Sequence, residues 1–349
     1  MALKHIFTTG VLFVFLASIG VAHGQVDVPG PAFRPKPIET YDNTRPLAAP
    51  GIFDYDTRMF APLEFTNGKE LEPQSGFYFT LDKTYTSVSR ADHQATNSTA
   101  VQTGSDYIWG TRYELGWLSE ADEGWALSYQ NSDGSYFTSG QDPLVSNPML
   151  VDTGVANVEV NRIFRQMLSQ GGYFEPYIGV RYFNVNDQTI EDTTQLAVAG
   201  VPVSNRFKQE ANNNSFGLQV GGRYNQRRGR FRVSVDGALA TNYNQQRYFA
   251  TDISTDGTTV AVAETYDSDQ SFVPILDGQL EIAYNISRDI SIRSGIQAFY
   301  AWNGIARANT LTTSLNGNSQ FGAGSGVGIS NDDSTFLGAG FIFGVEWRR

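Results

Sequence analysis

The chain of 349 residues carries 36 acidic and 25 basic residues, which gives a formal net charge of −11, and it contains no cysteine. The acidic balance argues against nucleic acid or an anionic membrane surface as a partner. Disulfides and thiol chemistry are excluded. Backbone hydrogen bonding and packing must therefore hold the fold together.

The N-terminus has the pattern of a secretory signal peptide. Lys4 precedes a short apolar stretch at residues 6–21, and Ala22 and Gly24 place small residues at the two positions that a signal peptidase reads. We predict cleavage after Gly24, so that residues 1–24 are the signal peptide. No later apolar run reaches the ~18 residues that a helical membrane span requires.

Residues 25–74 differ in composition from the rest of the chain. Eight of the 13 prolines lie in this stretch. Such a density is incompatible with regular helix or sheet, so we predict an extended periplasmic segment or linker before the folded domain at residues 75–349.

From residue 75 onward, apolar and polar residues alternate, which is typical of strands with one apolar and one polar face. We predict about ten strands of this kind. They cover approximately residues 76–90, 105–118, 124–131, 155–167, 172–185, 214–227, 230–245, 272–287, 289–303 and 334–348. The pattern is weakest at 155–167, because Arg162 shares a face with Val158, Val160 and Phe164.

The connections between these strands alternate strictly between long and short. The long ones, at about 91–104, 132–154, 186–213, 246–271 and 304–333, are polar and rich in Asn, Thr, Ser, Gly and Asp. Tight turns at one end and long loops at the other are typical of transmembrane β-barrels. We therefore predict an all-β, antiparallel, up-and-down transmembrane β-barrel of about ten strands, with twelve as the alternative count, short periplasmic turns and long outer loops.

Several segments resemble the porin-like outer-membrane β-barrel families of bacteria, many of whose members are uncharacterised. These segments are residues 109–117 (WGTRYELGW), 177–182 (YIGVRY), 216–224 (FGLQVGGRY), 290–302 and 341–347 (FIFGVEW). The resemblance covers residues 76–349. It implies an address in the outer membrane, with outer-membrane lipid and the barrel-assembly and chaperone machinery as partners. One departure is that Trp347 is followed by two arginines, whereas many such chains end on an aromatic residue.

If the apolar faces meet lipid, the charged residues of the opposite faces point into the lumen. These residues are Arg112, Glu114, Glu175, Arg181, Arg223, Arg232, Asp236, Asp277, Glu281, Arg293 and Glu346. They form either a structural network of ion pairs, since buried charges must be paired, or the lining of a narrow polar channel. Aromatic residues near strand ends are candidates for the interfacial girdles: Trp109, Trp117, Trp125, Tyr300, Trp302 and Trp347.

Chemistry-bearing clusters are scarce. His93 is the sole histidine after the signal peptide, and although Asp92 precedes it, a solvated loop residue is favoured over a catalytic pair. A histidine-based zinc site lacks partners. The acidic loops, with Asp252, Asp256, Asp267 and Asp269 or Asp332 and Asp333, lack the spacing of a known calcium motif. We therefore expect neither an enzyme nor a cofactor or metal site.

The predicted function is a porin-like or structural outer-membrane barrel, with passive diffusion of small polar solutes if the lumen is open. One alternative is a closed barrel whose long outer loops serve binding or adhesion. Another is a soluble secreted β-protein, in which the apolar faces would pack against each other.

Overall fold

The computed structural model describes most of the predicted barrel domain. The described residues are 75–89, 101–103, 107–139, 148–168, 172–196, 202–255, 260–287, 289–308 and 334–348. The predicted signal peptide, the Pro-rich segment and His93 lie outside these ranges. The described part contains no helix long and apolar enough to cross a membrane.

Alternating side chains make almost every described residue part of a strand, because the two-residue period suits a pleated backbone. The ten long strands are β1 (Gly76–Val88), β3 (Tyr107–Leu118), β4 (Glu123–Ser139), β5 (Pro148–Phe164), β7 (Gly172–Leu196), β8 (Pro202–Arg228), β9 (Phe231–Thr255), β10 (Val260–Asn285), β11 (Ile290–Ile305) and β12 (Ser334–Arg348). Two short strands, β2 (Val101–Thr103) and β6 (Gln166–Met167), pair with β4 and β7.

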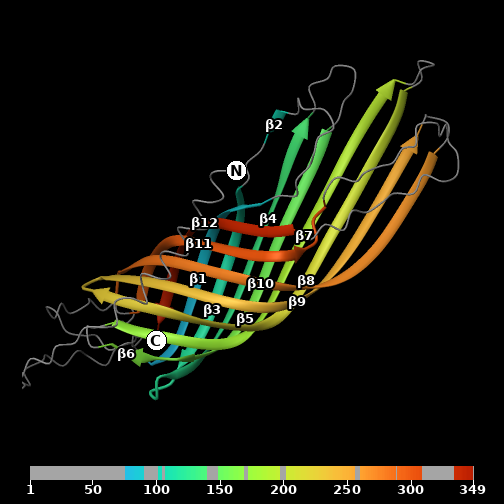
Figure 1. Ribbon diagram of the computed structural model, residues 1–349. Coiled ribbons are helices and arrows are strands. Elements are labelled where there is room, and N and C mark those ends of the chain that lie inside the picture. Colours follow the sequence, from blue (N-terminus) through green and yellow to red (C-terminus); the bar gives the residue numbers. More distant parts are fainter. Residues whose placement is uncertain are drawn as a thin grey trace, which may run out of the picture. The chain divides into compact units, whose positions relative to one another are not determined.

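Each long strand is antiparallel to its neighbours, and the first meets the last. β1 pairs with β3 on one side and with β12 on the other, which closes the sheet into a barrel (Figure 1). The predicted ten-stranded antiparallel up-and-down barrel is confirmed. Closure leaves neither β1 nor β12 as an open edge of the sheet, as hydrocarbon surroundings require. Residues 260–274 of β10 pair with β9 alone, because β11 pairs with β10 only from Ile275 onward.

The strands differ from the prediction in their length. β7 and β8 continue to Leu196 and Pro202, and β9 and β10 continue to Thr255 and Val260, so most of 186–213 and 246–271 is paired strand rather than loop. The same holds in part for 132–154, since β4 ends at Ser139 and β5 begins at Pro148. In these extensions the outward positions carry many amides and hydroxyls in place of aliphatic residues. The strand therefore continues, although the alternation of apolar and polar residues that predicts it is lost.

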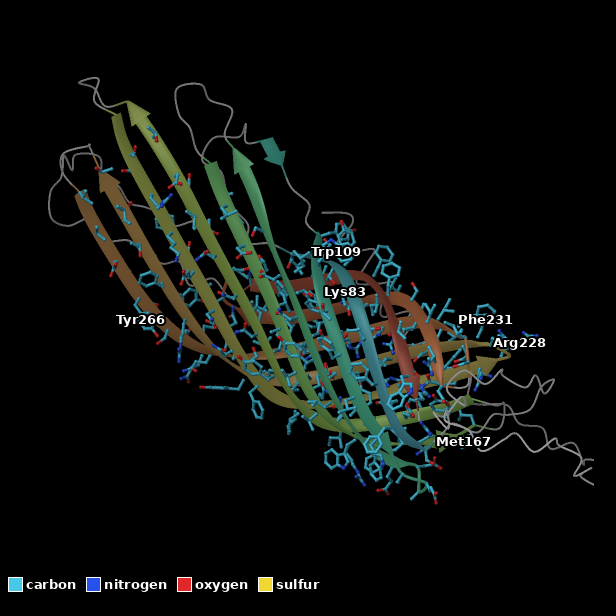
Figure 2. All side chains as sticks on the ribbon, turned by 180° about the vertical axis from the view of Figure 1, so that it is seen from behind. Lys83, Trp109, Met167, Arg228, Phe231 and Tyr266 are labelled. Atoms are coloured by element: carbon cyan, nitrogen blue, oxygen red, sulfur yellow. The ribbon has the colours of Figure 1, made fainter. Side chains whose placement is uncertain are left out.

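We call the end of the barrel with the tight turns at 119–122 and 229–230 the short-turn end, and the opposite end the hairpin end. At the hairpin end, β7–β8 and β9–β10 project as two long ribbons, which pair with each other through β8 and β9 as far as Ser204 and Thr255 (Figure 1). Tyr266 lies on this projecting part, far from Phe231 and Arg228 at the short-turn end (Figure 2).

The outward face carries an apolar band, which on β7–β10 ends at a row of aromatic residues on the side of the hairpin end. On β8, Phe216, Leu218 and Val220 are each more than half exposed. Four outward aromatic residues of β7–β10 lie side by side in register at this edge: Tyr182, Phe216, Tyr243 and Phe272. The next outward row consists of amides: Asn184, Asn214, Gln245 and Gln270. Farther out on β10, Tyr266, Val262 and Val260 are exposed apolar residues of the projecting part. An apolar band bordered by aromatic residues is what a barrel wall in lipid presents.

Candidate functional site in the barrel interior

The pleat places every second side chain inside the barrel, where the predicted lumen charges are found. All eleven of them lie on the inner face, with side-chain exposures from 1% to 28%. The structure brings them together in three groups, each spanning several strands, so that charges far apart in sequence become neighbours.

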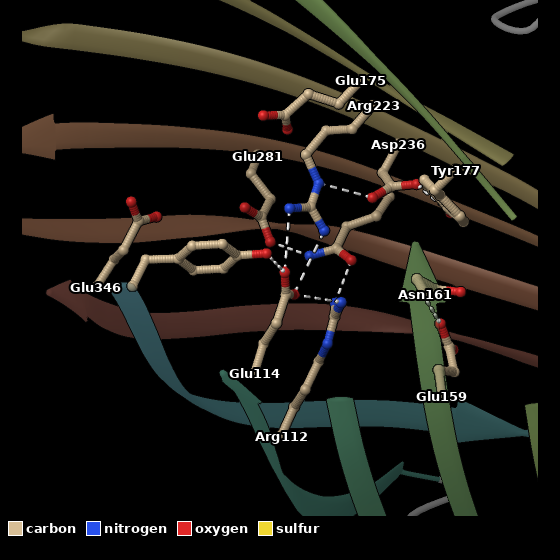
Figure 3. Close-up of polar contacts among 12 residues, drawn as sticks. Arg112, Glu114, Glu159, Asn161, Glu175, Tyr177, Arg223, Asp236, Glu281 and Glu346 are labelled. Carbon is tan, nitrogen blue, oxygen red and sulfur yellow. Dashed lines mark hydrogen bonds and ion pairs between the residues drawn. The ribbon is translucent and has the colours of Figure 1, made fainter. Parts of the chain in front are cut away.

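Glu114 is the centre of the first group (Figure 3). Its carboxylate is 2% exposed and lies 3.1 Å from Arg112 Nη2 and 3.0 Å from Arg223 Nη1. The Tyr78 hydroxyl donates a third hydrogen bond to it at 2.9 Å. Arg223 also pairs with Asp236 at 2.8 Å. A carboxylate that accepts from two arginines and a phenol is well compensated for its burial.

Glu346 and Arg293 form the second group, across the seam where the barrel closes. Arg232 pairs with Glu346 through both terminal guanidinium nitrogens, and the distance from Nη1 to Oε1 is 2.9 Å. Arg293 lies 3.0 Å from Asp82 and also pairs with Glu281. These contacts connect β1 and β12 with β9, β10 and β11, so they hold the first and last strands to the rest of the wall.

The third group surrounds Arg181, whose side chain is 1% exposed. It pairs with Asp277 at 3.0 Å and donates to Asn157 at 2.9 Å. Nearer the short-turn end, Glu175 pairs with Arg165 at 2.8 Å. Opposite charges across the lumen therefore brace facing walls of the barrel.

Six further charged residues share this interior and were not predicted for it. They are Asp82, Glu159, Arg165, Asp187, Arg307 and Arg348. For four of them, the place in the two-residue alternation could have indicated an inward side chain. Asp82, Glu159, Arg165 and Arg348 lie on the polar-face positions of their segments. Arg348 points inward and pairs with Glu346, so Trp347 is the last outward residue of β12.

These side chains fill most of the space between the walls. A cavity of about 50 Å³ remains among them, with Arg112, Glu114 and Arg181 in its lining and Phe183 and Phe299 at its border. That volume accommodates only a few water molecules. The side chains of the charged layer are thus packed closely, as in a protein core.

An apolar layer lies beside the charged layer, towards the hairpin end. The rings of Phe183, Phe299 and Phe336 approach one another with centroids 5.7 to 6.4 Å apart. All three are at most 7% exposed and belong to a cluster with Val155 and Ile275. No such layer was predicted, because each phenylalanine occupies a position with the parity of the polar face.

The last residues of β11 and the three residues that follow it enter the lumen, beyond a register shift between Ala301 and Ile305. Asn303 and Gly304 have positive φ angles of 53° and 74°, and this double left-handed step turns the chain inward. A Cβ on Gly304 would lie 2.7 Å from Ser271 Oγ, so glycine is required by both space and φ. Residues 305–308 are at most 3% exposed. Arg307 pairs with Asp187 and donates to the Ser89 carbonyl at 2.7 Å.

The predicted girdle residues fall into two groups at different heights. Trp117 and Trp125 are neighbours in register towards the short-turn end, where Trp347 is half-buried. Trp109 and Trp302 are 62% exposed towards the hairpin end, and Tyr300 packs edge-on against Trp302 at 5.9 Å.

Arg162, which weakened the strand pattern, does point outward from β5. Its guanidinium carbon lies 5.1 Å from the Trp125 ring centroid, and its Nη2 pairs with Glu123. An arginine near the short-turn end can keep its charge in a polar zone while its stem covers apolar surface. The residue therefore fits an outward face close to the edge of the band.

Charges on the projecting ribbons form exposed pairs. Arg206 lies 2.7 Å from Asp192, and its hydrogen bonds hold the pKa of that carboxyl below its ordinary value. Of the acidic residues weighed for calcium, Asp256, Asp332 and Asp333 lie outside the described residues. Within the described residues, no group of three or more histidine or carboxylate side chains is placed to hold a metal ion.

No protein-family model and no curated protein sequence matches the chain. Solved structures with a similar fold include the outer membrane protease OmpT from Escherichia coli, at 7% identity and a TM-score of 0.41, over 79% of this chain and 94% of that one. Neisserial surface protein A matches at 11% identity and 0.27, over 80% and 100%. The Pseudomonas putida toluene transporter TodX matches at 9% and 0.26, over 79% and 91%.

Proposed function

We propose that this protein is a sealed outer-membrane β-barrel that anchors its projecting ribbons β7–β8 and β9–β10 outside the membrane for binding, rather than a diffusion pore. The proposal includes export through the signal peptide, insertion by the barrel-assembly and chaperone machinery, and contact of the apolar band with outer-membrane lipid. It corresponds to the closed-barrel alternative of the sequence analysis.

The filled lumen is the observation that carries this proposal. Three successive layers occupy it: the paired charges, the phenylalanines and the inward segment at residues 304–308. An open pore requires a continuous polar path wide enough for hydrated solutes. The cavity of about 50 Å³ among the paired charges has room for only a few water molecules.

The test is electrical conductance of the purified full-length protein in planar lipid bilayers. We expect the wild type to be silent when a heat-dependent mobility shift on gels shows that it is folded. Regular conductance steps from the folded wild type would overturn the proposal and would support passive diffusion instead.

A matched pair of double variants then locates the seal. Phe299→Ala with Phe336→Ala removes two inward rings and should raise ion leak. Phe341→Ala with Phe343→Ala removes two outward rings of the same sheet, stacked at 6.5 Å, and should leave the barrel silent. Equal leak from both variants would contradict a seal formed by the inward rings.

A further inference from the structure

The inward segment is held by a set of polar side chains that we call the polar wall: Thr189, Asn213, Asn244, Gln246 and Ser271. They come from β7, β8, β9 and β10, the four strands that form the projecting ribbons. All of them face the lumen on the hairpin-end side of the phenylalanine layer. A site contributed by four successive strands is built by the sheet and not by one local turn.

The polar wall binds the backbone of its occupant. Asn244, Gln246 and Ser271 converge on the Gly304 carbonyl oxygen at 2.6, 2.8 and 2.8 Å. Asn213 makes a two-way pair with Ala306, donating to its carbonyl at 2.8 Å and accepting from its amide at 2.7 Å. Thr189 donates to the Ala308 carbonyl at 3.2 Å.

These contacts fall on residues 304, 306 and 308, every second residue of the segment. A period of two is the spacing of an extended chain, whose alternate residues face the same side. Reading alternate backbone groups is how proteins recognise extended peptides, with side-chain pockets between them providing selectivity. The polar wall therefore has the pattern of a peptide site.

The side chains of the occupant enter pockets of distinct chemistry. Ile305 packs in the apolar cluster with Ile275 and Phe336, whereas Ala306 and Ala308 lie against Ala211 and Tyr248. Arg307 pairs with Asp187, which is 0% exposed, and its guanidinium carbon lies 5.0 Å from the Phe336 ring centroid. The other carboxylate oxygen of Asp187 accepts from Thr153 at 2.8 Å, which fixes its orientation.

We propose that the polar wall and Asp187 form a binding site for an extended peptide segment of the pattern apolar–small–arginine–small, and that the chain's own residues 304–308 occupy this site in cis. Binding in trans displaces the cis segment. The proposal rests on the proposed function only in that the site must open to the outside at the hairpin end.

The experiment uses the folded full-length protein in detergent micelles and a fluorescent, end-blocked peptide of the sequence Gly-Ile-Ala-Arg-Ala. The matched peptide carries citrulline, which is uncharged, in place of arginine. Arg307→Ala weakens the cis occupant, and Arg206→Ala, which removes an exposed arginine from the outer face of β8, is the control.

We expect the arginine peptide to bind Arg307→Ala about tenfold or more tightly than it binds the wild type or Arg206→Ala, because a weakened internal competitor no longer masks the site. The citrulline peptide should bind Arg307→Ala about tenfold less tightly than the arginine peptide, since its hydrogen bonds to Asp187 are not charge-assisted. Equal affinity for the three proteins, or no binding to any, would show that the polar wall only braces the barrel.

A second measurement does not depend on the folding of Arg307→Ala. The chain has no cysteine, so Ala306→Cys introduces a single thiol at a position that is 0% exposed. The arginine peptide should raise its reactivity with a membrane-impermeant maleimide, and the citrulline peptide should not. Unchanged reactivity would overturn the proposal.

The two proposals fail separately. A wild type that is silent in bilayers but shows no effect of the peptide loses only the peptide site. If the wild type conducts and the peptide raises the thiol reactivity of Ala306→Cys, only the sealed-barrel function is lost.

Discussion

The two ends of the barrel interior solve the same packing problem with different chemistry. Around Glu114, the partners are two arginines and the Tyr78 hydroxyl, all of them side chains of the wall itself. Around Asn213, one partner is a neutral amide and the other is the backbone of an inserted segment. Both partners of an ion pair between wall strands are fixed in the barrel, so neither can be replaced by another molecule. A wall that binds the backbone of an inserted segment can bind the backbone of a different peptide instead. We therefore propose that the charged layer braces the barrel, whereas the polar wall binds peptide.

Breaking the charged layer should have the largest effect. Glu114→Ala leaves Arg112 without its carboxylate partner and Arg223 with Asp236 alone in a buried site, and we expect it to lower the free energy of unfolding by about 3–5 kcal/mol. Denaturant unfolding in micelles measures the change. The matched control is Glu123→Ala, whose ion pair with Arg162 lies on the outer face. It should cost no more than about 1 kcal/mol, and equal losses would contradict the distinction.

A second comparison concerns the outward face, between a position inside the apolar band and a position in the amide row beyond it. Val220→Arg puts a charge in the middle of the apolar band on β8 and should cost about 2–4 kcal/mol of unfolding free energy in lipid. Gln245→Arg, in the amide row beyond the band, should cost at most about 1 kcal/mol. Similar costs would mean that the lipid boundary is not at the aromatic row.

Loss of one polar-wall contact should have an intermediate effect. Asn213→Ala removes both hydrogen bonds to Ala306, and we expect a loss of about 1–3 kcal/mol, because buried backbone groups are left unsatisfied. Asn214→Ala, on the outward side of the same strand, should change stability by about 0.5 kcal/mol or less. A larger effect at Asn214 than at Asn213 would contradict the assignment of the inner face as the binding side.

The smallest effect should come from an exposed pair on the projecting ribbons. Hydrogen bonds from Arg206 lower the pKa of Asp192, so this pair stabilises the fold above the ordinary carboxyl pKa and loses its contribution as pH falls through the lowered pKa. Hydrogen exchange of the β7–β8 amides should be slightly slower in the wild type than in Asp192→Asn at neutral pH. The two should coincide in acid, and a difference that grows in acid would reverse the sign.

The barrel topology could be predicted from the sequence because ten segments keep an apolar face in strict alternation, as in residues 109–117. The inward direction of the charges followed from the same parity. The full lengths of β7–β10 could not be predicted from the sequence. Their outward faces change from aliphatic residues to amides just beyond Tyr182 and Phe216, so the apolar–polar alternation weakens there.

The contents of the lumen were harder to predict for two physical reasons. Phe183, Phe299 and Phe336 lie on the face expected to be polar, and apolar residues on an inner face show no period of their own. The inward turn at Asn303 and Gly304 depends on two positive φ angles and on the space beside Ser271, which only the folded sheet defines. Sequence spacing therefore indicates which wall a residue belongs to but not what fills the space between walls.

The contacts across the seam between β1 and β12 constrain the order in which this molecule can assemble. Arg293 pairs with Asp82 from 211 residues away, and Arg307 reaches Ser89 across 218 residues. Partners so remote in sequence meet only when the circle of strands is completed, and contacts of this range make folding slow. Until that moment the lumen charges retain their water. The interior therefore loses its water in the same late step in which β1 pairs with β12. This makes an unclosed barrel easy to distinguish from a closed one.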